Sequence, residues 1–353
     1  MSTIAVNAIT DASGGNTASI NGATPTTDNL MGKNRLINGD MRIDQRNAGA
    51  SVTPSSGASY TLDRWKNYNS QASKLSLQQN AGSVTPPAGF TNYLGVTSLS
   101  AYSVTSSDEF DLYQLVEGLN IADLGWGTAN AQTVTLSFWV RSSLTGTFGG
   151  SIQNSGASRN YPFSYTISSA NTWEQKTITV SGDTSGTWLT TNGIGMYLLF
   201  SLGAGSSLIG SAGSWTGTAA VGVTGQINLV GTNGATWQLT GVQLEAGSVA
   251  TSFERRHYGQ ELALCQRYYE LIYSDGQGVM PLSYAYNATN HFNWYSFKVE
   301  KRATPTVTKL NGTWSGGTAA GYPSVGGVTF FATSAFYLSA SPWIKTFEIV
   351  AEL

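Results

Sequence analysis

The carboxylate side chains of this sequence are its main candidates for catalysis. A glycosidase needs two carboxyl groups that flank a sugar bond at a defined separation. The sequence places no two of its acidic residues at that separation, and turn, capping and salt-bridge roles are the simpler explanation for them. We therefore expect no catalytic pair and no enzyme. Two groups of acidic residues lie close together in sequence: Asp108, Glu109 and Asp111, and Asp40, Asp44 and Asp63.

Histidine and cysteine are too few for the common metal and nucleophile sites. Only His257 and His291 occur, and neither has the H-E-x-x-H spacing of a zinc site. Cys265 is the single cysteine, which excludes an intrachain disulfide. Because Cys265 falls on an apolar stripe, we expect a small buried hydrophobic residue and not a nucleophile.

Aromatic residues could stack on sugar rings, because an aromatic face is a flat apolar surface with polar groups at its edge. Strand alternation places Trp139 and Trp173 opposite the aliphatic residues, beside Arg141 and Gln175. A glycan could bind to that face, or a loop or a second subunit could cover it. The other candidates for glycan contact are Trp188, Trp215, Tyr284, Tyr286, Trp294 and Tyr295.

The composition narrows the class of protein. Only 11% of the residues are charged, 41 are glycine, and the net charge is -2. Such a chain has no basic surface to capture nucleic acid, so we expect no nucleic-acid partner. The start has no basic segment followed by an apolar one, and no run of 18 apolar residues occurs, so we expect a soluble chain with no secretory signal and no membrane insertion.

Strand patterns and turns dominate from Asn34 to Phe253. In the segment from Thr133 to Arg141, Val134, Leu136, Phe138 and Val140 share one face, which predicts a half-buried strand. A second such strand is predicted from Trp173 to Val180. With 353 residues the chain exceeds one ordinary core, so we expect a β-sandwich or jelly roll and a second folded unit.

Residues 254–273 carry a different pattern, in which apolar residues recur at spacings of four and three. This spacing predicts one helix with an apolar stripe. The stripe is too short to establish a coiled coil, so two alternatives stay open: a helix packed on its own domain, and a seam at an oligomer axis. The seam candidates are Tyr258, Leu262, Cys265, Tyr269 and Ile272. Residues 274–353 return to strand patterns and predict a smaller C-terminal β domain.

Several sequence blocks, in this order, carry a resemblance to a known family. NRLINGDMRIDQRNAGASVTP with YTLDRW resembles the opening of the carbohydrate-binding-module-like jelly roll of phage tail fibre proteins, and WQLTGVQLEAGSVATSFERR resembles its last strand. YQLVEGLN and VTLSFWVRSS lie between them. ITDASGGNTASINGATPT and YGQELALCQRYYE are similar to other phage fibre segments. The resemblance covers the first 270 residues or so, and nothing specific matches after Asp275.

The resemblance implies a virion protein of a bacteriophage, on a tail or head fibre. It implies a homotrimer, an N-terminal arm (residues 1–30) that docks to another virion protein, a jelly roll (residues 31–253), and recognition of host cell-surface glycans. Some related modules hold a structural calcium beside their first and last strands, which makes Asp40 and Glu245 candidate ligands. No other cofactor is expected.

The sequence thus predicts a mainly β protein: an extended N-terminal arm, a jelly-roll β-sandwich, one short helix at residues 254–273, and a C-terminal β domain at 274–353 that forms the tip. The predicted function is structural, a fibre or adhesin that displays β domains for host attachment. A purely structural fibre or capsid decoration protein without glycan binding is the alternative. A polysaccharide-degrading spike is a third class, and it would need the carboxylate pair that the sequence does not reveal.

Overall fold

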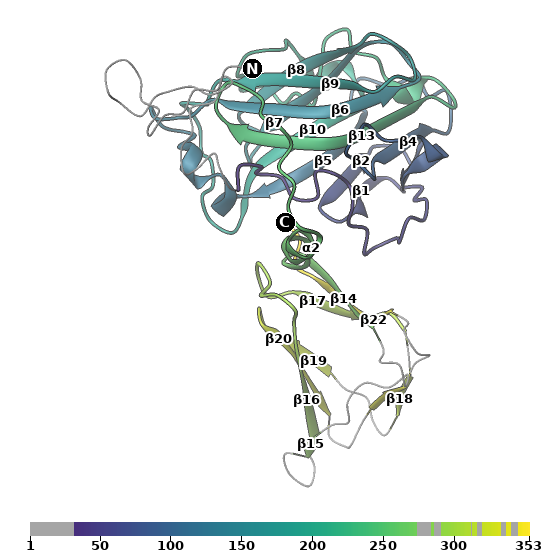
Figure 1. Ribbon diagram of the computed structural model, residues 1–353, viewed down its shortest axis with the longest axis vertical. Helices are drawn as coiled ribbons and strands as arrows, with labels where there is room; N and C mark the ends of the chain where they lie inside the picture. The colour runs from purple at the N-terminus through teal and green to yellow at the C-terminus, as the bar shows by residue number, and fades with distance from the viewer. Residues whose placement is uncertain are drawn as a thin grey trace, which may run out of the picture.

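The computed structural model describes residues 32–273, 284–285, 291–311, 313–315, 320–332, 337–339 and 345–353. The arm predicted for residues 1–30 lies outside these ranges. Figure 1 shows a broad β-sandwich, a short helix below it, and a narrower β unit that extends away beyond the helix. The chain is mainly β, as the sequence predicted, and its two units follow one another along the long axis.

A six-stranded antiparallel sheet forms one layer of the sandwich, with the strand order β1-β2-β5-β10-β7-β8. Side chains alternate between its faces, so Phe110, Leu112 and Val116 of β5 point into the core. The strands are β1 (Gly57–Leu62), β2 (Trp65–Asn69), β5 (Glu109–Glu117), β10 (Ile194–Ala204), β7 (Gly146–Gln153) and β8 (Asn160–Ile167).

A five-stranded antiparallel sheet forms the second layer, with the order β3-β4-β13-β6-β9. The predicted inner face of β6 is confirmed, because all four of its residues are fully buried: Val134, Leu136, Phe138 and Val140. The strands are β3 (Leu75–Gln79), β4 (Leu94–Ser98), β13 (Thr236–Ala246), β6 (Val134–Ser142) and β9 (Glu174–Val180). Short 3-10 helices connect the strands: η1 (Ala81–Ser83), η2 (Gly118–Asn120), η3 (Ala122–Leu124), η4 (Ser206–Leu208) and η5 (Leu229–Gly231).

The two sheets make a jelly-roll β-sandwich, because the chain crosses repeatedly from one sheet to the other. Strands that are far apart in sequence become neighbours: β5 lies between β2 and β10, and β13 lies between β4 and β6. Large aromatic rings fill the space between the layers. Phe200 lies 6.5 Å from Trp65 and 5.8 Å from Trp237, measured between ring centroids.

One long connection lies on the outer face of the six-stranded sheet. This cover segment, residues 205–228, contains the short parallel strands β11 (Ile209–Gly210) and β12 (Gly222–Val223). A Cβ atom at Gly149 would lie 2.4 Å from the Gln226 side chain and 2.9 Å from that of Val223, so glycine permits the close approach. Gln226 also donates a hydrogen bond to Ser201 Oγ at 2.8 Å. The sandwich therefore covers part of its own surface.

The helix is shorter than predicted. Helix α2 covers Tyr258–Gln266, and the chain then forms strand β14 (Tyr269–Tyr273). The prediction of one helix over 254–273 is wrong because Tyr269 and Ile272 are buried by strand pairing with β22 and not by a helical stripe. Aromatic and β-branched residues favour a strand there. Within the described residues, no helix is long and apolar enough to cross a membrane.

The C-terminal unit begins at β14, before the predicted boundary at residue 274. Its sheets have the orders β14-β22-β17 and β15-β16-β20-β19, with the pair β18-β21 beside them. A small core joins Ile272, Phe330 and Phe347. The remaining strands are β15 (Tyr284–Ala285), β16 (His291–Ser296), β17 (Thr306–Lys309), β18 (Thr313–Ser315), β19 (Ala320–Pro323), β20 (Gly327–Ala332), β21 (Tyr337–Ser339) and β22 (Lys345–Val350).

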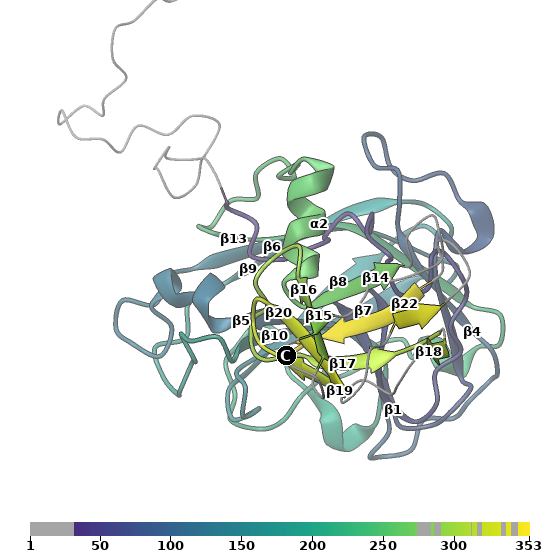
Figure 2. The ribbon, with the colours of Figure 1, turned by 90° about the horizontal axis from the view of Figure 1, so that it is seen from below.

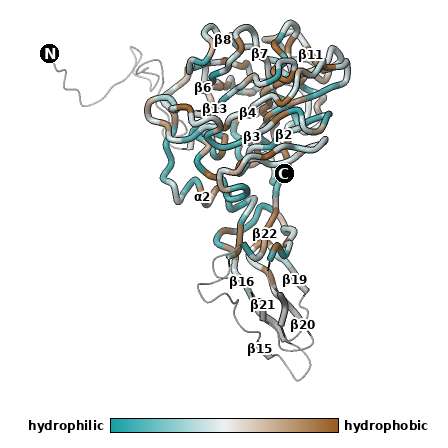
Figure 3. The backbone as a smooth tube through the Cα atoms, turned by 90° about the vertical axis from the view of Figure 1, so that its right-hand side faces the viewer, coloured by the Kyte–Doolittle hydropathy of each residue, from teal (hydrophilic) through white to brown (hydrophobic). Residues whose placement is uncertain are grey.

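The C-terminus returns to the sandwich and joins the two units. Glu352 forms ion pairs with Arg46 and Arg64, and both Glu352 and Arg64 are buried. Leu353 packs against the outer face of the six-stranded sheet. Figure 2, seen from below, shows the C-terminal strands within the outline of the sandwich, and Figure 3 shows hydrophobic segments in the sandwich and near β22. The units are therefore connected through buried charges as well as through the chain.

Candidate functional site

The outer face of the five-stranded sheet brings Trp139 and Arg141 together on β6. Both point outward because Phe138 and Val140 point into the core, and both are half-buried. Trp139 lies opposite Gln175 of β9 on one side and Thr240 of β13 on the other. The tryptophan ring therefore lies in the middle of a polar sheet surface.

Arg141 is held by two neutral acceptors. Its Nε donates to the backbone oxygen of Asn171 at 3.0 Å, and its Nη1 donates to Gln238 Oε1 at 3.1 Å. These two bonds come from different parts of the chain, the turn before β9 and the neighbouring strand β13. These bonds fix the orientation of the guanidinium group. Its Nη2 atom makes no hydrogen bond to any described residue.

Trp173 directly precedes β9, two residues before Gln175, and so lies on the same outer face. Its Nε1 donates to the Thr85 backbone oxygen at 2.9 Å. Its ring meets that of Tyr93 at 5.6 Å in an edge-to-face arrangement. Trp173 is therefore anchored along one edge and half-exposed, which leaves part of the ring open to solvent.

The loop of residues 81–93, which we name the aromatic loop, borders this surface. Its conformation is fixed by Tyr93, whose hydroxyl donates to the Ala81 oxygen at 2.7 Å and accepts from the Val84 N–H at 2.8 Å. At Gly241, where φ is 62°, a Cβ atom would lie 2.6 Å from the Phe90 ring and 3.2 Å from Trp139. Only glycine allows the loop and Trp139 to meet over β13. We name Tyr93, Trp139, Arg141 and Trp173 the aromatic platform.

Trp188 and Trp215 lie elsewhere, in a cluster at one end of the sandwich. Trp126 meets Trp188 at 4.7 Å and Trp215 at 5.4 Å, both edge to face. Trp188 is buried, and its Nε1 donates to Asp183 at 3.2 Å. Trp215 is half-buried and donates to the Ser181 oxygen at 2.8 Å. Trp188 therefore presents no open ring face to solvent, and glycan contact at Trp188 and Trp215 stays a prediction.

The candidates of the C-terminal unit differ in their environment. Trp294 on β16 is 51% exposed, and its Nε1 donates to Ser296 Oγ at 2.8 Å. Tyr295 points the other way and meets Phe297 of the core at 6.5 Å. Tyr284 lies on β15, and its side chain is outside the described part of the chain, as is the whole of Tyr286. Of the two side chains that the structure describes, Trp294 is exposed and Tyr295 is half-buried.

The five seam candidates do not form one surface. Tyr258 is 57% exposed, whereas Cys265 is fully buried in a cluster that Leu262 contacts. Tyr269 and Ile272 lie on β14 and are buried in this chain. The continuous seam is therefore wrong, because the helix ends before Tyr269. Burial raises the pKa of the Cys265 thiol well above its usual range, which agrees with the prediction of an unreactive cysteine.

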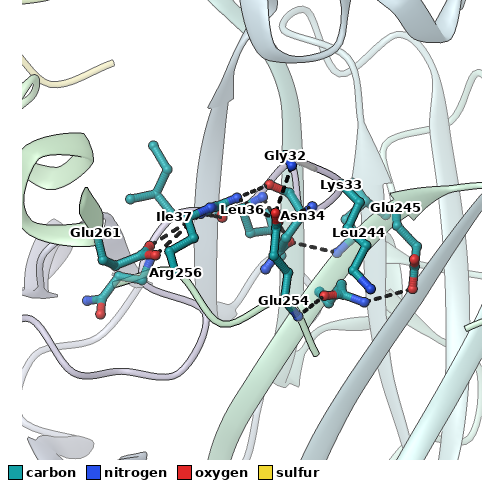
Figure 4. Close-up of polar contacts among 12 residues, drawn as sticks. Gly32, Lys33, Asn34, Leu36, Ile37, Leu244, Glu245, Glu254, Arg256 and Glu261 are labelled. Carbon is teal, nitrogen blue, oxygen red and sulfur yellow. Dashed lines mark hydrogen bonds and ion pairs between the residues drawn. The ribbon is translucent and has the colours of Figure 1, made fainter. Parts of the chain in front are cut away.

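The segment of residues 32–38, which we name the N-terminal strap, is bound by charged side chains that follow β13 (Figure 4). Glu254 accepts from the N–H groups of Gly32 at 2.7 Å and Asn34 at 2.8 Å. Arg256 donates to the backbone oxygens of Asn34 and Leu36 and forms an ion pair with Glu261 of α2. Every charged group here has protein partners, so these contacts serve to anchor the strap.

A pocket of about 300 Å³ lies beside the strap. Its charged lining residues are already engaged: Arg256 as above, and Arg35 with Asp123 at 2.5 Å. Of these two side chains, only Arg35 has a buried nitrogen, Nε, without a hydrogen-bond partner. The other lining residues are Gly32, Asn34, Ile37, Leu119, Asn120, Gln260 and Leu264.

The two aspartates of the first acidic group lie in different environments. Asp108 accepts hydrogen bonds from Ser70, Tyr102 and Thr105, which lower its pKa although burial alone would raise it. Asp111 is fully buried, and burial with the nearby Glu109 raises its pKa well above the usual range. One carboxylate is saturated by donors and the other has no access to solvent.

The second acidic group and the calcium candidates are likewise structural. Asp63 accepts two hydrogen bonds from Gln45, both at 2.7 Å, and burial raises its pKa to about 6. Glu245 accepts from the N–H and hydroxyl of Thr251 and from Gln243. Oxygens surrounded by donors do not suit a cation. Asp40 pairs with Arg42 through Oδ2, whereas its buried Oδ1 has no hydrogen-bond partner. Among the described residues, no group of acidic, histidine or cysteine side chains could hold a metal.

Comparisons with known proteins give structural likeness and no sequence family. No protein-family profile and no curated protein sequence matches the chain. The chain is similar to an enzymatically active domain of tailspike protein 4 from bacteriophage CBA120, at 10% identity and a TM-score of 0.30, over 52% of this chain and 20% of that one. The match spans only a fifth of the tailspike chain.

Two further solved structures match over their full length. A sugar-binding protein from Bacteroides thetaiotaomicron has 12% identity and a TM-score of 0.35, over 61% of this chain. A family 11 carbohydrate-binding module from Clostridium thermocellum, in complex with a mixed-linked tetrasaccharide, has 12% identity and a TM-score of 0.29, over 57% of this chain. At these scores the likeness is one of general β architecture, and any argument about function depends on the side chains themselves.

Proposed function

We propose that this chain is a non-enzymatic glycan-binding protein of a phage virion, a fibre or adhesin that attaches to the host surface. The observation that carries the glycan-binding part is the aromatic platform on the outer face of the five-stranded sheet. Trp139 and Trp173 are half-exposed there and lie beside polar residues. Sugar rings bind to such surfaces through their apolar C–H faces, while their hydroxyls hydrogen-bond to the polar groups around the rings.

The platform is prepared for binding before any ligand arrives. The Thr85 oxygen and Tyr93 hold Trp173, and the Asn171 oxygen and Gln238 hold Arg141. Fixed side chains lose little conformational entropy when a ligand binds, so even a shallow site can give measurable affinity. Exposed Gln175, beside Trp139, adds a further hydrogen-bonding group.

The test is binding of purified bacterial polysaccharides and of whole host cells by the full chain and by the variants Trp139→Ala and Trp173→Ala. We expect each variant to bind at least about tenfold more weakly, because stacking on one ring contributes roughly 0.5–1.5 kcal/mol and each variant also removes apolar contact area. Affinity electrophoresis in polysaccharide gels measures the change.

Trp294→Ala is the matched control, because it removes an exposed tryptophan from the other unit. We expect this variant to bind as the parent does. If Trp294→Ala abolishes binding while Trp139→Ala does not, the recognition site lies on the C-terminal unit and the assignment to the platform is wrong.

The virion location is supported by the ordered sequence blocks from Asn34 to Glu270 that resemble phage fibre proteins. With it we propose a homotrimer and docking to another virion protein through residues 1–30. Linked copies would raise the strength of attachment, because weak contacts act at a high effective concentration. Deletion of residues 1–30 should abolish incorporation into particles, as measured by immunoblot of purified virions, and normal incorporation would exclude the docking role.

We propose binding without hydrolysis because neither aspartate of the first acidic group is free to act on a substrate. Asp108 is saturated by three neighbouring side chains, and Asp111 is buried. Incubation of the chain with each polysaccharide that it binds should release no reducing ends. Release of reducing ends above that of a heat-inactivated sample would show an enzyme.

A purely structural fibre or decoration protein is the second candidate. The cover segment and Leu353 pack on the outer face of the six-stranded sheet, so that face needs no ligand or partner to bury its apolar residues. That function predicts incorporation into the virion with no polysaccharide binding by either unit.

A further inference from the structure

We propose that the aromatic platform selects acidic saccharides, in which Arg141 binds a carboxylate or phosphate group of the sugar stacked on Trp139 or Trp173. This inference rests on the proposed glycan-binding function and names its class of ligand. It follows from the position of Arg141 and from the lack of acidic side chains near it.

Arg141 is a cation without an acidic partner among the described residues. Ten ion pairs occur in that part of the chain, and Arg141 takes part in none of them. Its two hydrogen-bond acceptors are a backbone oxygen and an amide oxygen, both neutral. The guanidinium therefore keeps its full charge and has Nη2 available for an oxyanion.

No acidic side chain lies close to Arg141 on the outer face of the sheet. The one acidic side chain on the outer face of the sheet is Glu245, which pairs with Thr135, six residues from Arg141 on β6 and so about 20 Å away. The other outward residues carry no charge: Ser76, Gln78, Thr97, Thr135, Ser137, Gln175, Thr177, Thr179, Thr236, Gln238, Thr240 and Gln243.

The acidic residue nearest in register is also neutralised. Glu174 lies opposite Val140, on the other face of the sheet, and pairs with Lys176 at 2.6 Å. A second cation, Arg255, lies 4.7 Å from the centre of the Phe90 ring in the aromatic loop and likewise has no acidic partner among the described residues. The platform thus has a local positive potential within a chain whose net charge is -2.

An acidic sugar matches both parts of this surface. Its ring presents an apolar C–H face for stacking on tryptophan, and its carboxylate or phosphate lies at the edge of the ring, where a fixed guanidinium can donate to it. A neutral sugar would use only the stacking part. The same fixed charge repels cationic amino sugars, so the site discriminates by charge as well as by shape.

The experiment compares each bacterial polysaccharide in its native form, after carboxyl reduction, and after removal of phosphate. Parent, Arg141→Gln, Arg141→Lys and Trp139→Ala proteins are run in affinity gels that contain each form. Arg141→Gln should bind native acidic polymers about tenfold or more weakly, since hydrogen bonds between charged groups are the strong ones. Arg141→Lys should retain part of the affinity, because it keeps the charge and loses the fixed guanidinium geometry.

Lys298→Gln is the control, because it removes one positive charge from an exposed position in the C-terminal unit. It should bind as the parent does. Raising the salt concentration should weaken the parent and leave Arg141→Gln almost unchanged, because a part-exposed charge pair is screened.

The outcomes separate the two proposals. Weaker binding after carboxyl reduction identifies a carboxylate, and weaker binding after phosphate removal identifies a phosphate. If parent and Arg141→Gln bind native and neutralised polymers equally, while Trp139→Ala binds neither, acidic selectivity is wrong and glycan binding stands. If the parent binds no polymer in any form, both proposals fail.

Discussion

The outer faces of the two sheets both carry aromatic residues, but one face is covered by other segments and the other is open to solvent. The six-stranded sheet carries the richer set of aromatic residues, with Tyr60, Tyr68, Tyr113 and Tyr197 on its outer side. Yet Lys66 lies over the rings of Tyr60 and Tyr113, and the cover segment and Leu353 pack beside them. The five-stranded sheet has two tryptophans on its outer face, and both keep solvent-exposed surface.

Coverage by other segments, and not aromatic content, decides which aromatic face stays open to solvent. Burial of the tyrosine face adds to stability, and exposure of the tryptophan face leaves its apolar area for a partner. A change on the covered face should therefore alter folding, whereas a change on the open face should alter binding.

Removal of the carboxylate that holds the C-terminus against the covered face should have the largest effect. Glu352→Ala leaves Arg46 and Arg64 without their buried partner, and we expect a loss of about 3–5 kcal/mol in the free energy of unfolding. Urea denaturation followed by tryptophan fluorescence measures it. Asp123→Ala removes the partner of Arg35, where the carboxylate is 48% exposed, and should cost less than about 1 kcal/mol. Equal losses in both variants would contradict the role of the buried Glu352 ion pairs.

Truncation of an aliphatic residue on the covered face comes second. Leu199→Ala should reduce the free energy of unfolding by about 2–4 kcal/mol, because Leu199 is buried beneath the cover and a cavity would remain. The control Leu119→Ala changes a leucine that is 55% exposed and should cost less than about 0.5 kcal/mol. A small loss at Leu199 would mean that the cover segment is not closed in solution.

Asp111, also on the covered face, gives a pH prediction with a defined sign. Burial raises its pKa when the protein is folded, so its contribution to stability is full below the unfolded pKa of about 3.9 and is lost as the pH rises toward the folded value. The Asp111→Asn variant has no carboxylate to ionise, so it avoids this loss. Its free energy of unfolding should exceed that of the parent by on the order of 1 kcal/mol at pH 7, with no gain at pH 3.

Asp108 provides the contrasting control, because hydrogen bonds lower its pKa in the folded state. Its contribution is present above the unfolded pKa and is lost as the pH falls, so Asp108→Asn should destabilise the protein at pH 7. Thermal unfolding between pH 3 and pH 8 measures both variants. If both shift in the same direction at pH 7, the assignment of the two environments is wrong.

The smallest effect on folding is expected on the open face. Trp139→Ala should change the free energy of unfolding by less than about 1 kcal/mol, because the ring is half-exposed, while it still weakens polysaccharide binding. Both quantities are measured on the same preparation. A stability loss as large as that of Leu199→Ala would show that Trp139 belongs to the packed interior.

The sequence could predict those parts of the fold that depend on local alternation. The faces of β6 and the outward position of Trp139, Arg141 and Trp173 follow from period two, and the structure confirms them. Alternation cannot tell whether an outward face is covered, because coverage depends on distant segments. Trp188, for example, is packed between the rings of Trp126 and Trp215, and no local sequence pattern predicts these two contacts.

The helix prediction also failed because burial depends on a segment that is distant in sequence. Spacings of four and three from Tyr258 to Ile272 fit one helical stripe, but the last two apolar residues are buried because β22, some 75 residues later, pairs with them. The run Tyr268-Tyr269 followed by Leu271 and Ile272 was the available signal for a strand. Aromatic loop residues such as Tyr93 were also missed, since only the folded chain brings them to Trp173.

The N-terminal strap has a consequence for how this molecule would bear a mechanical load. A pull applied at residue 32 enters through the Glu254 bonds to Gly32 and Asn34 and through the Arg256 bonds to Asn34 and Leu36. These bonds are loaded together and pass the tension directly to the segment after β13 and, through Glu261, to α2. Because several bonds would have to break at once, we expect the sandwich to keep its shape under tension applied at residue 32.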